Sequence, residues 1–379
     1  LFVQIIYIQD IQFSIIFLRS LNMHLKLIIS SLFICFLGSF WGQSGGLNSF
    51  AFLNLDYSAR NAALAGTAIS LQTDDINLAI SNPSLLNNEM HKKIAFNHAF
   101  LSGGINYGMF AYAHQLKKGT VAGSLKYNDY GKMIMTESNG IAIGEFRPFE
   151  YILGLSYGYQ LNPNISVGTS VNLIGSHLES YSAFAASIDI AGTYMHINKL
   201  FSVSAIFKNA GIKFKDYTSN DSGFLPADMQ LALSYKLRHA PFRFSMLIHK
   251  LNQWNLDYVD PNAQPTYDPL TGSLIPVPSI SFIENLARHF AFSTELNVSK
   301  NIHLRMGLNY LRRQELKLTD RPGMSGFTLG AGFNFSKIRI DYGFTIYSRA
   351  GFNNLLSIST PIDKWRKQKK MRIITTPAF

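Results

Sequence analysis

The sequence predicts an all-β protein: a transmembrane antiparallel β-barrel of about 14 strands with a small N-terminal helical, or hatch, segment. Three observations predict it. Apolar and small polar residues alternate with a period of two from Ile94 almost to the end of the chain. The runs are about 9 to 12 residues long, which lets a tilted strand cross a bilayer. Only 15% of the residues are Asp, Glu, Lys or Arg, against roughly 25% in soluble domains.

The stretch YILGLSYGYQLNPNISVGTSVNLIG, residues 151 to 175, shows the pattern most clearly. Leu155 and Val171 belong to its apolar face, and the opposite face holds Gly, Ser, Gln and Asn. A soluble sandwich would place Lys, Glu and Thr on that polar face. We therefore expect the apolar face to contact lipid and the small polar face to line a lumen, with Tyr157, Tyr159 and Tyr310 in aromatic girdles. Because hydrocarbon forbids unpaired backbone groups, the sheet must close.

The same assignment turns the larger apolar residues of every run toward lipid, including Tyr107 and Met109 in the run from 105 to 113. Fourteen runs begin near Lys93, Gly104, Gly119, Glu150, Asn164, Ser182, Leu200, Asp228, Pro241, Ala287, Asn301, Ser325, Lys337 and Asn353.

Short and long connections alternate along these runs. The short ones include 116–118, 162–163, 198–199, 239–240 and 299–300, and the long ones are 129–149, 209–227, 251–286 and 314–324. Barrels of this kind keep short turns in the periplasm and long loops outside. Both termini are therefore predicted to be periplasmic, and residues 93–360 form the barrel.

The N-terminal region is predicted to direct export. Residues 1–22 precede the first Met and are excluded from the fold, and residues 23–42 carry a basic start and an apolar core typical of a signal peptide. The apolar run is shorter than the roughly 20 residues of a membrane anchor. Cys35, the only cysteine, lies inside this segment, and Ile34 before it is too large for a lipoprotein signal.

Residues 43–92 do not alternate and form a separate element. Residues 59–68 are rich in Ala and Leu and favour a helix, Asp74 and Asp75 resemble a turn or cap, and Pro83 ends what precedes it. Such a segment either plugs the lumen of the barrel or caps it from the periplasm.

The sequence contains no motif of a known reaction. It has no GxSxG, HExxH, P-loop or Ser-x-x-Lys pattern, and the histidines between His98 and His303 lie on different predicted strands and turns. We therefore predict no enzyme, no cofactor and no metal site. The net charge is +11, and six of the basic residues lie in the tail, residues 361–379, which is predicted to be periplasmic; a nucleic-acid partner is not expected. That tail is either a solvated end or a contact for acidic groups.

The long loop 251–279 combines aromatic residues, which are favoured in protein interfaces, with prolines, which restrict the backbone. We predict that it holds a protein partner; a lid without a partner is the alternative. The candidate residues are Trp254, Tyr258, Pro261, Pro265, Tyr267, Pro269 and Pro276.

The segment DYSARNAALAGTAISLQTDD, followed by NPSLL, resembles the N-terminal signature of the PorV/PorQ branch of FadL-type outer-membrane barrels. Segments 303–316, 323–335 and 340–354 are similar to the last strands of that family, so the resemblance covers about residues 48–358. The residues that carry the hatch motif are Ser58, Arg60, Gly66, Asp74, Asp75, Asn82 and Pro83.

This resemblance implies a 14-stranded barrel with an N-terminal hatch that serves in the attachment complex of the type IX secretion system. It also implies partners: a PorZ-like surface protein held by the extracellular loops, other subunits of that complex, and outer-membrane lipid or lipopolysaccharide. The modest length favours the PorQ side of the branch. The alternative is a FadL-like channel for hydrophobic solutes, which would contain an apolar pocket and a lateral opening.

Overall fold

The computed structural model describes residues 49–101, 103–218, 223–256, 265–267, 270–275, 280–317, 323–347 and 351–365. The predicted signal peptide, the residues upstream of it and almost all of the basic tail lie outside these ranges. The same is true of Tyr258, Pro261, Pro269 and Pro276 from the predicted partner loop.

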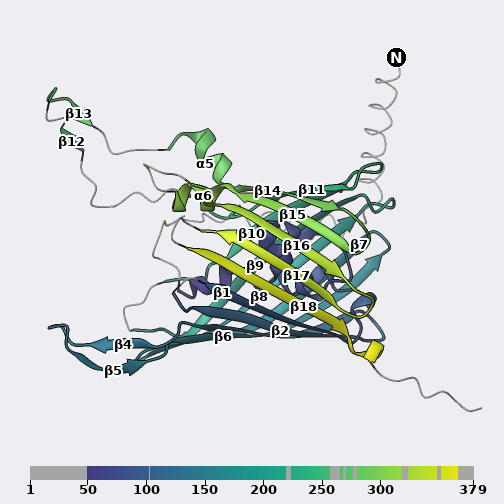
Figure 1. Cartoon of the computed structure of the whole chain (residues 1–379), viewed down its shortest axis with the longest axis horizontal. Coiled ribbons are helices and arrows are strands. Elements are labelled where there is room, and N and C mark those ends of the chain that lie inside the picture. Colours follow the sequence, from purple (N-terminus) through teal and green to yellow (C-terminus); the bar gives the residue numbers. More distant parts are fainter. Residues whose placement is uncertain are drawn as a thin grey trace, which may run out of the picture. The chain divides into compact units, whose positions relative to one another are not determined.

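Fourteen antiparallel strands form one closed barrel, in which β1 pairs with β18 (Figure 1). Its strands are β1 (Lys93–Leu101), β2 (Asn106–Gln115), β3 (Thr120–Asp129), β6 (Phe149–Asn162), β7 (Ile165–Leu178), β8 (Tyr181–Met195), β9 (Phe201–Lys215), β10 (Asp228–Lys236), β11 (Phe242–Ile248), β14 (Phe290–Asn297), β15 (Ile302–Asn309), β16 (Phe327–Asn334), β17 (Arg339–Ile346) and β18 (Phe352–Pro361). The predicted fold class is confirmed, and every predicted strand start lies within three residues of the observed one.

The predicted loops contain structure that the alternation did not indicate. Two small hairpins, β4 (Met133–Thr136) with β5 (Ala142–Phe146) and β12 (Thr266–Tyr267) with β13 (Leu274–Ile275), lie outside the barrel sheet. Helices α5 (Phe282–Arg288) and α6 (Tyr310–Leu316) and the short η5 (Ile362–Trp365) complete the elements around the barrel.

The aromatic residue Tyr310 therefore begins a helix and does not extend β15. The side chain of Asn309 caps α6 by accepting a hydrogen bond from the backbone N–H of Arg312 at 2.9 Å. The hydroxyl of Tyr310 donates to Glu284 of α5 at 2.8 Å. The cap ends the strand, so this tyrosine joins two helices at the barrel rim.

No helix in the described ranges is both long and apolar enough to cross a membrane.

We call the end of the barrel that carries the short β2–β3, β6–β7 and β14–β15 turns the short-turn end, and the opposite end the long-loop end. The barrel begins at Lys93 and finishes at Pro361 on the short-turn end, where these residues pair. The first described residues lie at the other end, because the N–H of Ser49 donates to the carbonyl of Phe224 between β9 and β10. The chain termini themselves lie outside the described residues.

The outward face of the barrel is apolar, as the alternation predicts. Leu155 is 63% exposed and Val171 is 47% exposed, whereas Ser156 and Ser170, on the same strands, are each 2% exposed. An exposed apolar belt of this kind is typical of a barrel in a bilayer.

The assignment made for β2 is wrong. Tyr107, Met109, Ala111 and Ala113 are at most 1% exposed and face the lumen, while Phe110 on the outward face is 51% exposed. The reason is that the lumen beside β2 is not aqueous. The N-terminal segment fills it and provides an apolar surface for these side chains.

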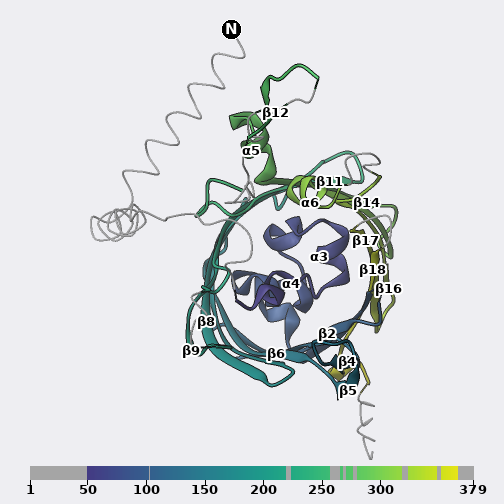
Figure 2. The same cartoon turned by 90° about the vertical axis from the view of Figure 1, so that its left-hand side faces the viewer.

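That segment, residues 49–92, is called the hatch from here on. It consists of η1 (Ala51–Asn54), α3 (Ala59–Ala63), η2 (Thr67–Ser70), α4 (Ile76–Ser81), η3 (Pro83–Leu85) and η4 (Asn88–Met90). Figure 2, which looks along the barrel, shows α3 and α4 inside the ring of strands.

The helix predicted over 59–68 breaks at Ala65 and Gly66, whose φ angles are +52° and +85°. These left-handed residues turn the chain from α3 into η2.

Candidate functional site in the barrel lumen

The hatch contacts all fourteen strands of the barrel. Helix α3 packs against β15–β18, η2 against β9, β10, β11 and β14, η3 against β6–β8, and α4 against β1 and β2. The remaining strand, β3, is reached by Tyr57, whose hydroxyl donates to Asn128 at 2.9 Å. The lumen is thus closed over its whole circumference by residues of the same chain.

Glycines on the inner wall make this close fit possible. A Cβ added to Gly168 would lie 2.3 Å from the carbonyl carbon of Pro83, and one added to Gly330 would lie 2.4 Å from Cβ of Ala63. Gly158, Gly307 and Gly343 meet hatch atoms in the same way. The small inner face seen in the sequence is therefore a seat for the hatch backbone.

Wall hydroxyls fix the hatch in three further places. Ser84 lies 2.6 Å from Thr193 of β8, oxygen to oxygen, and Ser70 lies 2.6 Å from Ser234 of β10. The carbonyl of Ala63 accepts a hydrogen bond from Thr328 at 2.8 Å. These bonds satisfy polar groups that the hatch buries inside the barrel.

A buried ionic network joins the hatch to strands β11, β14, β15 and β17. The guanidinium of Arg60 donates to both oxygens of Glu295 at 3.0 and 3.1 Å. Glu295 also accepts from Arg305 at 2.9 Å and from Arg243 at 3.2 Å. Arg305 in turn donates to Asp341 at 2.6 Å.

The network returns to the hatch through Arg339 of β17. Its guanidinium donates to Asp341 at 2.9 Å and lies 3.7 Å from Asp75 of the hatch. Burial raises the pKa of Asp75, but the charges of Arg339, Arg60 and Arg305 outweigh this effect and hold it below its ordinary value. Asp75 is thus held as a carboxylate between two wall arginines and Arg60.

Most residues of the predicted hatch motif shape the hatch or contact the barrel wall. Ser58 caps α3 by accepting from the N–H of Asn61 at 3.3 Å, and Asn82 caps η3 by accepting from the N–H of Ser84 at 3.0 Å. Pro83 meets the wall at Gly168. Asp74, at the short-turn end, is exposed and pairs with Lys93, the first residue of β1.

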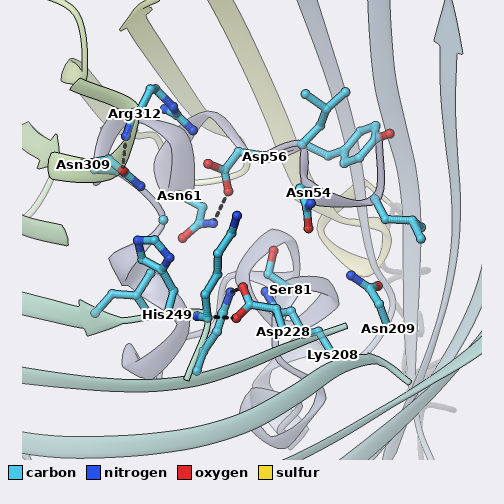
Figure 3. A pocket seen from close by; sticks show the side chains of 18 of the residues that line it. Asn54, Asp56, Asn61, Ser81, Lys208, Asn209, Asp228, His249, Asn309 and Arg312 are labelled. Carbon is cyan, nitrogen blue, oxygen red and sulfur yellow. Dashed lines mark hydrogen bonds between the residues drawn. The ribbon is translucent and has the colours of Figure 1, made fainter. Parts of the chain in front are cut away.

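A charged cavity of about 350 Å³ lies between the hatch and the long-loop end. We call it the vestibule. Hatch residues such as Asp56 and Asn61 form part of its lining (Figure 3). The exposed residues Asn54 and Glu315 also line it and mark its open side. The same cavity is lined by Lys126, Asp189, Lys208, Asp228, His249, Lys250 and Arg312.

The acidic and basic groups of the vestibule differ in their bonding. The carboxylate of Asp56 accepts from the side chain of Asn61 at 2.6 Å, and that of Asp228 accepts from Gln230 at 2.5 Å and from the backbone N–H of Lys250 at 2.6 Å (Figure 3). Asp189 accepts from Asn172 and from the N–H of Asn209. These acids are held by neutral amide donors.

At the long-loop end, aromatic and aliphatic side chains are exposed. Trp254 is 52% exposed and packs on Phe282 of α5, with ring centroids 5.2 Å apart, and on His289 at 5.5 Å. Ile283 is 76% exposed and Tyr267 is 70% exposed. Of the residues predicted to bind a partner, Trp254 thus lies at the barrel rim, while Tyr267 and the exposed Pro265 belong to the neighbourhood of the separate β12–β13 hairpin.

The alternation of apolar and polar residues did not single out the wall charges of the network or the vestibule. Arg243, Glu295 and Arg305 occupy inward positions on strands whose other inward residues are small or neutral, and Arg339 and Asp341 share the inward face of β17. A charged residue at an inward position of a predicted membrane-spanning strand is the sequence signal that would have identified them. In the described ranges, no group of three or more His, Cys, Asp or Glu side chains is arranged to hold a metal ion.

Comparisons with known proteins bear on the fold. No protein-family model and no curated protein matches the sequence. Among solved structures, the toluene transporter TodX of Pseudomonas putida aligns with a TM-score of 0.50 and 14% identity, over 80% of this chain and 98% of its own. The deltaS2 mutant of the TodX monoaromatic hydrocarbon channel aligns with a TM-score of 0.51 and 15% identity, over 81% of this chain and 99% of its own. A FadL homologue of Pseudomonas aeruginosa aligns with a TM-score of 0.45 and 11% identity, over 80% of this chain and 98% of its own. The chain has the fold of the TodX structures, a closed fourteen-stranded barrel with an N-terminal helical segment.

Proposed function

We propose that this chain is a non-enzymatic outer-membrane barrel that holds a protein at the cell surface through its long-loop end. The observation that carries the proposal is the hatch, which contacts every strand and is fixed by a buried ionic network. Opening the lumen would break these contacts together. A barrel closed in this way is suited to a role in attachment.

The resemblance to the PorV/PorQ branch gives this proposal its partners. In that arrangement the short-turn end faces the periplasm, and the long-loop end presents Trp254, Tyr267 and the exposed face of α5 to a PorZ-like protein and other subunits of the type IX attachment complex. Exposed aromatic residues are favoured in protein interfaces because they bury much apolar surface with few rotatable bonds.

Deleting residues 255–279 tests the attachment role. The expected result is release of the surface partner into the medium, while the barrel stays in the membrane and retains its heat-modifiable migration on gels. If every surface protein stays attached in the deletion strain, the loop does not hold a partner and the proposal is wrong.

A second candidate is a channel for hydrophobic solutes. The fold likeness supports it, since TodX is described as a toluene transporter. So does an apolar depression of about 390 Å³ in the outer wall, lined by residues such as Phe244, Met246, Phe292 and Met306. The charged lining of the vestibule weighs against it, because a path for hydrocarbons should be apolar.

An engineered disulfide between the hatch and the barrel wall would distinguish the attachment function from the channel function. The hydroxyl oxygens of Ser70 and Ser234 lie 2.6 Å apart, so the two side chains face each other closely enough to be tested as a disulfide pair. Ser70→Cys with Ser234→Cys should therefore lock the hatch, and Cys35 is the only cysteine in the natural sequence.

An attachment barrel should retain its partner equally well when oxidised and when reduced, whereas a lumenal channel should take up toluene only after reduction. The single variant Ser70→Cys is the matched control, and it should respond to neither treatment.

A further inference from the structure

The basic side chains of the vestibule have unused hydrogen-bond donors. Lys126, Lys208, Lys250 and Arg312 all line the cavity. Lys126 lies over the ring of Tyr57 at 5.5 Å, and Arg312 lies over that of Tyr347 at 5.1 Å. Within the described part of the chain, none of the four side chains forms a hydrogen bond or ion pair with a protein acceptor.

The acids of the same cavity receive their hydrogen bonds from amide groups and not from these cations, although Asp228 interacts electrostatically with Lys208 and Lys250. The carboxylates of Asp56, Asp189 and Asp228 already accept hydrogen bonds from amide groups. Glu315 stands exposed at the rim on α6. The interior of the vestibule therefore has donors in excess, although its formal charges are balanced.

His249 adds an unpaired polar group that is almost wholly buried. The residue is 6% exposed, lines the vestibule, and its Nε2 atom has no hydrogen-bond partner in the described structure (Figure 3). Burial lowers the pKa of His249 to about 3, with Lys250, His289 and Arg312 adding to the effect. The ring is therefore neutral at physiological pH, and its unpaired nitrogen can bond a ligand atom or a water molecule.

We propose that the vestibule binds a small hydrophilic anion, a solute whose carboxylate or phosphate group accepts hydrogen bonds from Lys208, Lys250 and Arg312 and whose polar body meets His249. The volume of about 350 Å³ is that of a cavity for a molecule of sugar size. The site opens at the long-loop end, so the solute would come from outside the barrel and would be stopped by the hatch. This inference is independent of whether the barrel holds a surface protein.

Calorimetric titration of the full mature barrel in detergent tests this site, with glucose 6-phosphate and glucuronate as anionic probes and glucose as the neutral one. Both anions should bind, glucose should bind at least tenfold more weakly, and rising ionic strength should weaken the anions only. Equal affinity for glucose and glucose 6-phosphate, or no binding of either anion, would overturn the proposal.

Substitutions then place the binding in the vestibule. Lys208→Gln and Lys250→Gln should each weaken glucose 6-phosphate binding by about 10- to 100-fold, the range expected for one charge-assisted hydrogen bond. The matched control is Lys236→Gln, which removes the same charge from β10 outside the vestibule and should leave binding unchanged. His249→Gln should weaken binding of both anions. Equal losses in Lys236→Gln and Lys208→Gln would show a general charge effect and refute the site.

Discussion

Neutralising Glu295 tests whether the ionic network keeps the hatch in the lumen. Its side chain is buried and receives four hydrogen bonds from three arginines, two of them from Arg60 of the hatch. Glu295→Gln keeps the size of the side chain and removes its charge. The four arginines then face two buried carboxylates, Asp341 and Asp75, instead of three, so one further buried positive charge is left without compensation.

The magnitude follows from how the lost contacts divide. Breaking a buried ion pair by removing one partner costs about 3–5 kcal/mol. Only Arg60 belongs to the hatch, because Arg243 and Arg305 lie on the wall. The hatch itself thus loses one charge-assisted pair, about 1.5–3 kcal/mol. Since about 1.4 kcal/mol is a factor of ten, the open fraction of the hatch should rise by roughly 10- to 100-fold.

Trypsin provides the assay. Arg60 is the only lysine or arginine between residues 49 and 91, and it is 4% exposed in the closed hatch. Cleavage after Arg60 therefore requires the hatch to open, and at low protease its rate follows the open population. In Glu295→Gln this rate should rise by the same roughly 10- to 100-fold.

Two further variants test whether the effect is specific to the charge of Glu295. Glu150 is also buried in the lumen, but its carboxylate accepts from Tyr130, Ser176 and Asn128 and from no arginine. Glu150→Gln should leave cleavage after Arg60 unchanged. Adding Arg243→Met to Glu295→Gln should restore part of the protection by removing the surplus charge. A cleavage rate in Glu295→Gln equal to that of the natural chain would refute the idea that the ionic network keeps the hatch in the lumen.

Three further outcomes are expected. Leu155→Arg places a charge on the lipid-facing belt at a cost of about 2–4 kcal/mol near the midplane, and should reduce membrane assembly as measured by heat-modifiable migration; normal assembly would contradict the lipid-facing assignment. Gly168→Val collides with Pro83 and should expose the hatch to protease, whereas Gly123→Val, which meets no atom within 4 Å, should not. The pKa of Asp75 is depressed, so its contribution to holding the hatch is complete above the ordinary value of 3.8 and is lost as pH falls through the lower value in the folded state. Pepsin cleavage of the hatch, measured relative to that of an unstructured peptide digested under the same conditions, should therefore rise only below the ordinary value of 3.8; a relative rate that does not change with pH would contradict this.

The barrel itself was predictable because its signal is local. Alternation along one strand reports which residues face each side, and the spacing of turns reports where each strand begins. For this reason the strand starts were accurate to within three residues. The helix α6 was missed because Tyr310 continues the apolar phase of β15, while the cap at Asn309, a single side chain, redirects the backbone.

The sequence by itself determined the barrel, its strand number and the apolar belt. Only the tertiary structure decided what fills the lumen and which charges meet there. Arg60 and Glu295 are 235 positions apart, and no periodicity links them, because the pair forms only once the sheet has closed around the hatch. The inversion of β2 has the same cause: Tyr107 and Met109 look like lipid-facing residues until the hatch provides an apolar surface on the lumen side of β2.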